Sequence, residues 1–196
     1  QGHPDAINDL GYAYLHGIGV NEDQFKAFQY FERAYELGSQ NAESNLALCY
    51  FSGMGCVQDS YKVAQYSKRG AENGLAQSQR LYAVCLLGGQ GVQKDEHKAL
   101  QLLYKAADQG DSGAEFFIAM HYIEKGDQLK GQEYLERSAK HGNSFASTTL
   151  AALKAENSNS SNCYIATATF GSPNASEVVF FRQFRDLFLL NSKSGR

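Results

Sequence analysis

The amino-acid sequence predicts an all-α solenoid built from successive pairs of helices. A pattern of small, apolar and charged residues returns after 36 residues, and then again after 36 more. Each copy contains two helix-length apolar stripes, and a glycine-rich joint separates them. A repeat of this length is one supersecondary unit, which buries its apolar face only against its neighbours. The 196 residues of the chain suffice for about four such units and a C-terminal segment.

The first copy shows how the pattern predicts each element. We expect its first helix over residues 4–16, followed by a Gly-x-Gly joint that begins at Gly17, because glycine adopts the left-handed backbone that ends a helix at little steric cost. Asp23 is placed to cap a second helix over residues 24–37. Lys26 lies in the first turn of that helix, where a positive charge opposes the helix dipole. We therefore expect this lysine to have another structural partner.

The same two-helix unit returns along the chain with one change in length. The second pair of helices is predicted over residues 42–52 and 60–73, and the third pair over 78–87 and 96–109. In the fourth copy the joint is shorter, so its second helix matches that of the third copy at a spacing of 32 residues. A lone helix over residues 145–156 is expected to cover the end of the stack, because terminal repeats are often atypical.

The recurring positions of the first copy identify a family resemblance. They are Ala6, Leu10, Gly11, Tyr14, Gly17, Gly19, Val20, Asp23, Lys26, Ala27, Tyr30, Arg33, Ala34 and Gly38. Together with the later copies, these residues resemble the Sel1-like repeat, a relative of the tetratricopeptide repeat. The resemblance covers about residues 4–156. It implies a right-handed superhelix of antiparallel helix pairs and a role as an adaptor between proteins, as bacterial members have in signalling, envelope or host-interaction assemblies.

The predicted partner site lies on the first helix of each copy. In related helical repeats these helices line a concave face, which accepts an amphipathic helix or an extended peptide. The alternative is a superhelix that is wound tightly enough to bury the same positions as ordinary core. The candidate residues for partner binding are Asn8, Tyr12, His16, Leu48, Phe51, Arg80, Val84, Leu87, Phe116 and Met120.

The composition changes at the end of the predicted solenoid, which we place at residues 1–156. Residues 157–162 are polar and predict a linker. Cys163 then opens the string Cys-Tyr-Ile-Ala-Thr-Ala-Thr-Phe-Gly-Ser, and Phe-Arg-Gln-Phe-Arg-Asp follows later. These two strings are similar to the bacterial CFI-box C-terminal segment, here residues 163–196. No established activity accompanies that resemblance.

A final helix is expected from about residue 174 to residue 190. Its apolar face holds Phe180, Phe181, Phe184, Leu187 and Phe188. So much aromatic surface has to pack against something, because it is unfavourable in water. It could cap the end of the solenoid, fill the groove of the solenoid as an autoinhibitory plug, or insert into another chain.

Several classes of function lack the residues that they need. A net charge of -3 leaves no basic face for nucleic acid. The five histidines are scattered, without the paired cysteines or the H-E-x-x-H spacing of a zinc site. The Gly-x-Gly strings follow predicted helices rather than strands, so they are helix ends and not phosphate loops. We therefore predict a non-enzymatic scaffold for a protein or peptide partner, with no catalytic residue, metal ion or small-molecule cofactor.

The C-terminal segment leaves two alternatives open. Cys163 follows a flexible linker and could be a reactive or modified thiol, which would make the chain a thiol-dependent enzyme or a modified-cysteine protein. The aromatic helix could instead lie on a membrane surface as a peripheral anchor. Few positive charges accompany this helix, so membrane contact is not expected.

Cysteine usage and the first residues bear on the compartment. Cys49 and Cys85 occupy the same repeat position on an apolar helix face, so we expect them to be buried free thiols. Free thiols favour a reducing compartment such as the cytoplasm. Residues 1–6 look like the joint between two repeats, so we expect the chain to begin inside a longer parent protein. A targeting signal upstream would then be missing from the sequence.

Overall fold

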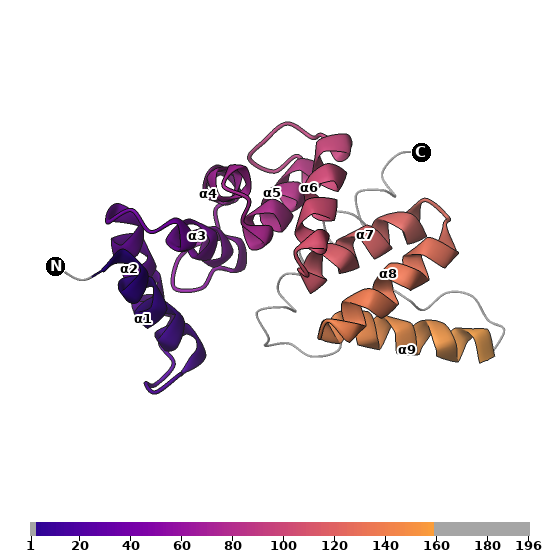
Figure 1. Ribbon diagram of the computed structural model, residues 1–196, viewed down its shortest axis with the longest axis horizontal. Coiled ribbons are helices and arrows are strands. Elements are labelled where there is room, and N and C mark those ends of the chain that lie inside the picture. Colours follow the sequence, from indigo (N-terminus) through magenta and orange to yellow (C-terminus); the bar gives the residue numbers. More distant parts are fainter. Residues whose placement is uncertain (1–2, 159–196) are drawn as a thin grey trace. The chain divides into compact units, whose positions relative to one another are not determined.

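A computed structural model describes residues 3–158 of the chain, and this part consists of α-helices joined by turns (Figure 1). The helices are α1 (Pro4–His16), α2 (Gln24–Glu36), α3 (Gln40–Ser52), α4 (Ser60–Glu72), α5 (Ala76–Gly88), α6 (Glu96–Asp108), α7 (Ser112–Glu124), α8 (Gln128–Lys140) and α9 (Ser144–Ser158). They alternate along the chain as first and second helices of four pairs, with α9 as the lone helix at the end. The predicted all-α repeat architecture is confirmed.

The joint between the two helices of a repeat follows from a few local contacts. Gly17 has a φ of 66° and ends α1 in the left-handed conformation. Asp23 caps α2, because its carboxylate accepts a hydrogen bond from the backbone N–H of Lys26 at 2.9 Å. The Asp23 N–H donates to the carbonyl oxygen of Tyr14 at 2.9 Å, which ties the joint back to α1. The predicted helix stop and helix cap are therefore confirmed.

The first helix of the second repeat begins earlier than the sequence indicated. α3 begins at Gln40, whereas the apolar pattern predicted a start at Ala42. Gly38 has a φ of 92°, so Ser39 can already take the extended conformation of a helix cap. The helix therefore begins at the residue that follows this cap. The same arrangement gives α5 its early start.

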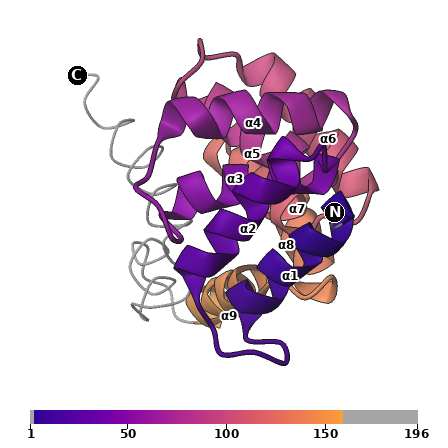
Figure 2. The same ribbon diagram turned by 90° about the vertical axis from the view of Figure 1, so that its left-hand side faces the viewer.

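The chain divides into two compact units after Leu102, within α6. In the first unit, α3 packs against α1, α2, α4 and α5 (Figure 2). The first helices of three successive repeats therefore form one layer, and α2 and α4 pack against it. In the second unit, α8 packs against α7 and α9.

Small residues allow the helices of a pair to approach closely. Phe31 of α2 is fully buried, and its ring lies 2.7 Å from the place where a methyl group on Gly11 would be. In the second unit, a methyl group on Gly131 would lie 2.5 Å from the side chain of Ile123. A side chain at either position would therefore hold the two helices apart. Truncation of Phe31 to alanine would cost about 3–5 kcal/mol, because the surrounding helices cannot collapse fully into the space.

The C-terminal predictions lie largely outside the described residues. α9 continues through Asn157 and Ser158, the first two residues of the predicted linker at 157–162. Helix ends are defined only to within one or two residues, so this is a small difference from the expected end at 156. The CFI-box-like segment at 163–196 lies outside the described residues, with Cys163 and the aromatic face of Phe180, Phe181, Phe184, Leu187 and Phe188. The thiol and membrane alternatives depend on that segment and stay predictions.

Candidate functional site

Polar side chains hold the first helices of consecutive repeats side by side. The hydroxyl of Ser39, at the start of α3, donates to the Asp5 carboxylate of α1 at 2.8 Å. The side-chain amide of Asn45 donates to the side-chain oxygen of Asn8 at 2.8 Å. Asn8 is buried and has little contact with water, so the amide of Asn45 provides the hydrogen-bond donor for its side-chain oxygen. Asn8 is one of the predicted site residues, and its side chain joins two repeats.

The contact between the second and third repeats is built in the same way. The hydroxyl groups of Ser44 in α3 and Ser78 in α5 share a hydrogen bond of 2.5 Å. The side-chain amide of Gln77 donates to the backbone oxygen of Ser44 at 3.1 Å. These contacts join residues 33 to 37 positions apart in the sequence. They fix the spacing of α1, α3 and α5 and thus the surface that these helices present.

The predicted site residues differ widely in exposure. In the first repeat Tyr12 is 48% exposed and His16 is exposed, and their rings lie 4.2 Å apart from centre to centre. At the equivalent position of the next two repeats, Leu48 is half-buried and Val84 is only 2% exposed. The predicted apolar stripe is therefore open in the first repeat and buried in the third. This outcome lies between a fully open groove and ordinary core.

The remaining candidates do not follow this order of repeats. Arg80 and Met120 are half-buried, whereas Phe51, Leu87 and Phe116 are buried. Phe116 and Met120 lie in α7 of the second unit, and the others lie in the first unit. The structure brings Tyr12 and His16 into contact and joins Asn8 to the next repeat.

The lysine of each repeat lies over a tyrosine ring. The Nζ atoms of Lys26, Lys62, Lys98 and Lys130 are 5.4, 4.5, 5.5 and 5.2 Å from the ring centres of Tyr14, Tyr50, Tyr82 and Tyr122. A cation over an aromatic face is attracted by the negative charge of the π system. The expectation that Lys26 has a structural partner is confirmed. The Lys26 ammonium group also pairs with the Asp23 carboxylate at 3.2 Å, and the helix-dipole argument could identify neither partner.

Sequence reasoning missed two buried carboxylates. Glu43 in α3 is 3% exposed, and Arg69 of α4 lies 3.1 Å from its Oε1 atom. Glu115 in α7 is completely buried and pairs with Arg137 of α8 and with His141, which follows α8. Burial raises the pKa of Glu43, and the nearby Arg69 opposes that rise. A buried carboxylate can act as a catalytic acid. Here the arginine partners of both glutamates, and the histidine partner of Glu115, instead join the two helices of a pair.

The described residues hold their titratable groups in structural pairs rather than in a reactive cluster. Cys49 and Cys85 are buried, as expected, and burial raises the pKa of each thiol to about 12. They therefore stay protonated and are poor nucleophiles at neutral pH. Within residues 3–158, histidine, cysteine and acidic side chains do not gather in threes as a metal site requires. None of the described helices combines the length and the apolar character needed to cross a bilayer.

Comparison with protein families decides the assignment. The model of the Sel1 repeat matches residues 4–39, 40–75, 76–111 and 116–143. The chain belongs to the Sel1 repeat family. Proteins of this family generally act as scaffolds for protein–protein interaction. The first three matched ranges coincide with the first three helix pairs, and the last range begins inside α7 and is shorter, partly because the joint of the fourth copy is short.

Solved structures of Sel1 repeat proteins share the fold. One is c5321, a protective antigen of uropathogenic Escherichia coli with a Sel1-like repeat fold, which is 29% identical with a TM-score of 0.62. The match covers 80% of this chain but 34% of the antigen, so the chain spans about a third of that protein's length. Another is a Sel1 repeat protein from Oxalobacter formigenes, which is 24% identical with a TM-score of 0.64 over 98% of this chain and 74% of that one. None of the curated proteins matches this chain.

Proposed function

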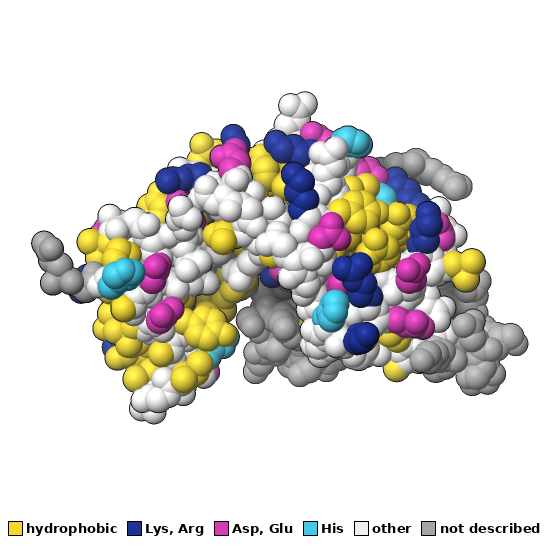
Figure 3. All heavy atoms as spheres, viewed as in Figure 1, with side chains coloured by type: hydrophobic (Ala, Val, Ile, Leu, Met, Phe, Trp, Pro, Cys, Tyr) yellow, Lys and Arg dark blue, Asp and Glu magenta, His cyan; other side chains and the backbone are white. Residues whose placement is uncertain are grey.

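We propose that this Sel1 repeat chain is a non-enzymatic scaffold that binds a protein or peptide partner through the face formed by the first helices of its repeats. The observation that supports this proposal is the concentration of exposed apolar side chains in the first repeat. Leu10 and Tyr12 lie on the first helix α1, Ile18 in the joint, Phe25 in α2 and Leu37 directly after α2, and they are between 38% and 61% exposed. Hydrophobic side chains are visible on the surface over α1 and α2 (Figure 3). Clustered apolar surface of this kind marks interaction sites on soluble proteins.

Tyr12 is the residue on which we expect partner binding to depend most. It lies on the face predicted from the sequence, it is half-exposed, and the ring of His16 supports it on one side. Tyrosine offers a large apolar ring together with a hydroxyl group, and few rotatable bonds have to be ordered when it binds. For these reasons tyrosine is enriched among the residues that dominate binding energy at interfaces. The polar contacts that join α1, α3 and α5 keep this surface in place before a partner arrives.

Peptides selected from a random display library against the whole chain test this proposal. We expect Tyr12→Ser to weaken the selected peptides at least tenfold, which corresponds to about 1.4 kcal/mol. Tyr61→Ser is the matched control, because Tyr61 is an equally large ring that is 69% exposed on the second helix α4. Binding measured by fluorescence anisotropy should be unchanged by this control. Equal losses in both variants, or loss only in Tyr61→Ser, would contradict a site on the first helices.

The C-terminal segment gives a second test of the same face. If residues 163–196 act as an autoinhibitory plug, a chain that ends at Asn162 binds the selected peptides more tightly than the full chain. If the segment caps the end of the solenoid instead, the affinity is the same in both chains. An unchanged affinity would refute the autoinhibition and leave the site on the first helices intact.

A further inference from the structure

The third repeat lacks two tyrosines that the other repeats stack on each other. The ring pairs are Tyr14 with Tyr30, Tyr50 with Tyr66 and Tyr122 with Tyr134, at centre-to-centre distances of 5.4, 5.9 and 5.9 Å and interplanar angles of 10°, 2° and 16°. The equivalent positions of the third repeat are Leu86 and Leu102. A leucine side chain is shorter than a tyrosine side chain and carries no hydroxyl group. The third repeat therefore lacks both the aromatic stack and the hydroxyl groups at this place.

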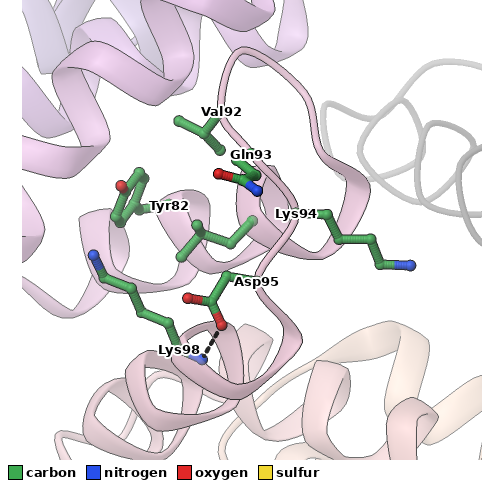
Figure 4. Close-up of a pocket in the computed structure, with 7 residues that line it drawn as sticks. Tyr82, Val92, Gln93, Lys94, Asp95 and Lys98 are labelled. Atoms are coloured by element: carbon green, nitrogen blue, oxygen red, sulfur yellow. Dashed lines mark hydrogen bonds between the residues drawn. The ribbon is translucent and has the colours of Figure 1, made fainter.

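A hollow of about 480 Å³ lies where the tyrosine of the first helix is missing. It is lined by Tyr82 and Leu86 of α5, by residues 92–95 of the joint and by Lys98 of α6. Figure 4 shows Tyr82, Asp95 and Lys98 around the hollow, while Lys94 extends away from it. The volume falls in the range of pockets that hold small ligands.

The polar frame around the missing ring is nevertheless complete. Asp95 caps α6 by accepting a hydrogen bond from the backbone N–H of Lys98 at 2.9 Å, as Asp23 does for α2. The Asp95 N–H donates to the carbonyl oxygen of Leu86 at 3.0 Å, so the joint has the same path as in the other repeats. The Nζ atom of Lys98 lies on the Tyr82 side of the hollow, 5.5 Å from the centre of that ring. The third repeat thus keeps the joint and the lysine of the other repeats, but the lysine lies over Tyr82, and the stacking partner of the missing ring is replaced by Leu102.

The second repeat shows how such a frame holds a phenol ring. There the Nζ atom of Lys62 lies 4.5 Å from the ring centre of Tyr50 and donates a hydrogen bond of 3.0 Å to its hydroxyl oxygen. Lys98 occupies the position of Lys62, and Leu86 occupies the position of Tyr50. The joint residue Val92 supplies a further apolar wall. Leu86 is buried, so a phenol in the hollow would meet mainly the half-buried Val92 and the exposed Lys98, whose ammonium group can donate to its oxygen.

We propose that the hollow of the third repeat binds the side chain of a tyrosine from a partner protein. The tyrosine ring packs against Val92 and the small exposed parts of Leu86 and Tyr82, and its hydroxyl oxygen accepts a hydrogen bond from Lys98. Phenylalanine binds more weakly because it lacks the hydroxyl group. This site lies at the joint between α5 and α6, and it does not rest on the proposal that the first helices bind a partner. Each proposal can fail without the other.

The experiment uses p-cresol, which is the side chain of tyrosine without its backbone, and the full chain labelled with ¹³C at its methyl groups. We expect p-cresol at millimolar concentration to shift the methyl signals of Leu86 and Val92 in a saturable way. The compound 4-methylcyclohexanol has the same outline without an aromatic ring, and we expect it to bind at least threefold more weakly. Absence of a saturable shift with p-cresol, or equal affinity for both compounds, would overturn the proposal.

Two variants locate the binding. Leu86→Tyr restores the residue of the other three repeats and fills the hollow, so p-cresol binding should be lost. Lys98→Met removes the cation and should weaken binding at least threefold, whereas the matched control Lys62→Met should leave it unchanged. Methyl spectra of each variant show whether it is folded. If Leu86→Tyr does not fold, the comparison of Lys98→Met with Lys62→Met still tests the proposal. Equal affinities of these two variants for p-cresol would overturn it.

Discussion

The second and fourth repeats bury a glutamate at the same position and satisfy it differently. In the second repeat, Arg69 reaches one oxygen of Glu43, and the other oxygen is buried without a hydrogen-bond partner. In the fourth repeat, Arg137 pairs with one oxygen of Glu115 and the Nδ1 atom of His141 lies 2.9 Å from the other. A carboxylate has two acceptor oxygens, and a buried acceptor without a donor carries its full desolvation cost. The same repeat position is therefore well satisfied in one copy and poorly satisfied in the other.

One residue at the end of the second helix makes the difference. His141 follows α8 directly, and Asn73 follows α4 at the equivalent place. The histidine ring reaches back to the buried carboxylate, whereas Asn73 is exposed. Repeat units that share a fold thus differ in stability through side chains outside the recurring pattern.

Removal of the arginine should give the largest difference between the two repeats. We expect Arg137→Met to lower the free energy of unfolding by about 3 kcal/mol, because Glu115 is completely buried and loses a charged partner. Arg69→Met should cost only about 1 kcal/mol, because burial already raises the pKa of Glu43 and the carboxyl group can take up a proton. Urea unfolding followed by circular dichroism measures both values.

A double variant checks the cause of that loss. Glu115→Gln combined with Arg137→Met removes the buried charge together with its partner. It should be more stable than Arg137→Met alone, since no unpaired charge remains. A double variant as unstable as the single one would show that the loss comes from packing of the arginine stem instead.

Replacement of each glutamate by glutamine should act in opposite directions. The pKa of Glu43 is raised in the folded protein, so its contribution to stability is present below the ordinary pKa of a glutamate and is lost as the pH rises through the raised value. Between pH 4 and pH 7, the wild type should therefore lose stability relative to Glu43→Gln. Glu115→Gln should be destabilised at pH 7 by about 1–3 kcal/mol, because Arg137 and His141 lose a charged acceptor.

The measurement is the free energy of unfolding of all three proteins at both pH values. If the two glutamine variants change the free energy of unfolding equally at pH 7, His141 does not stabilise the Glu115 carboxylate. A constant difference between Glu43→Gln and the wild type over this range would contradict the raised pKa of Glu43.

The tyrosines of these two repeats should give the smallest effect. The hydroxyl groups of Tyr122 and Tyr104 share a hydrogen bond of 2.7 Å, and burial together with this bond holds the pKa of Tyr104 above its usual range. Tyr122→Phe leaves the half-buried Tyr104 without that partner and should cost about 0.5–1 kcal/mol. Tyr50→Phe should cost less, because its partner Lys62 is exposed and can bind water instead.

Spectrophotometric titration adds a readout that a packing change alone would not move. The pKa of Tyr104 should fall part of the way towards its ordinary value in Tyr122→Phe, since burial, the larger cause of the rise, remains while the hydrogen bond is gone. An unchanged titration, together with a loss of stability, would point to the ring rather than to the hydroxyl group.

Much of the local structure was predictable because it depends on neighbours in the chain. Asp23 caps α2 through the backbone three residues later, and Gly17 ends α1 through its own backbone conformation. The starts of α3 and α5 were placed too late, since the apolar pattern marks where a helix becomes buried and not where it begins. The candidate residues for partner binding were placed on the first helices from the sequence, but their differing exposure was not predictable in this way.

The sequence by itself determined the family, the helix pairs, the joints and the lysine that needed a partner, because these depend on residues that recur at a regular spacing. Only the tertiary structure decided that Tyr12 is open while Val84 is buried, that Glu115 has two partners while Glu43 has one, and that a hollow lies beside Leu86. Each of these depends on how side chains from different helices meet. A one-dimensional pattern places residues on faces, but it does not measure the space between them.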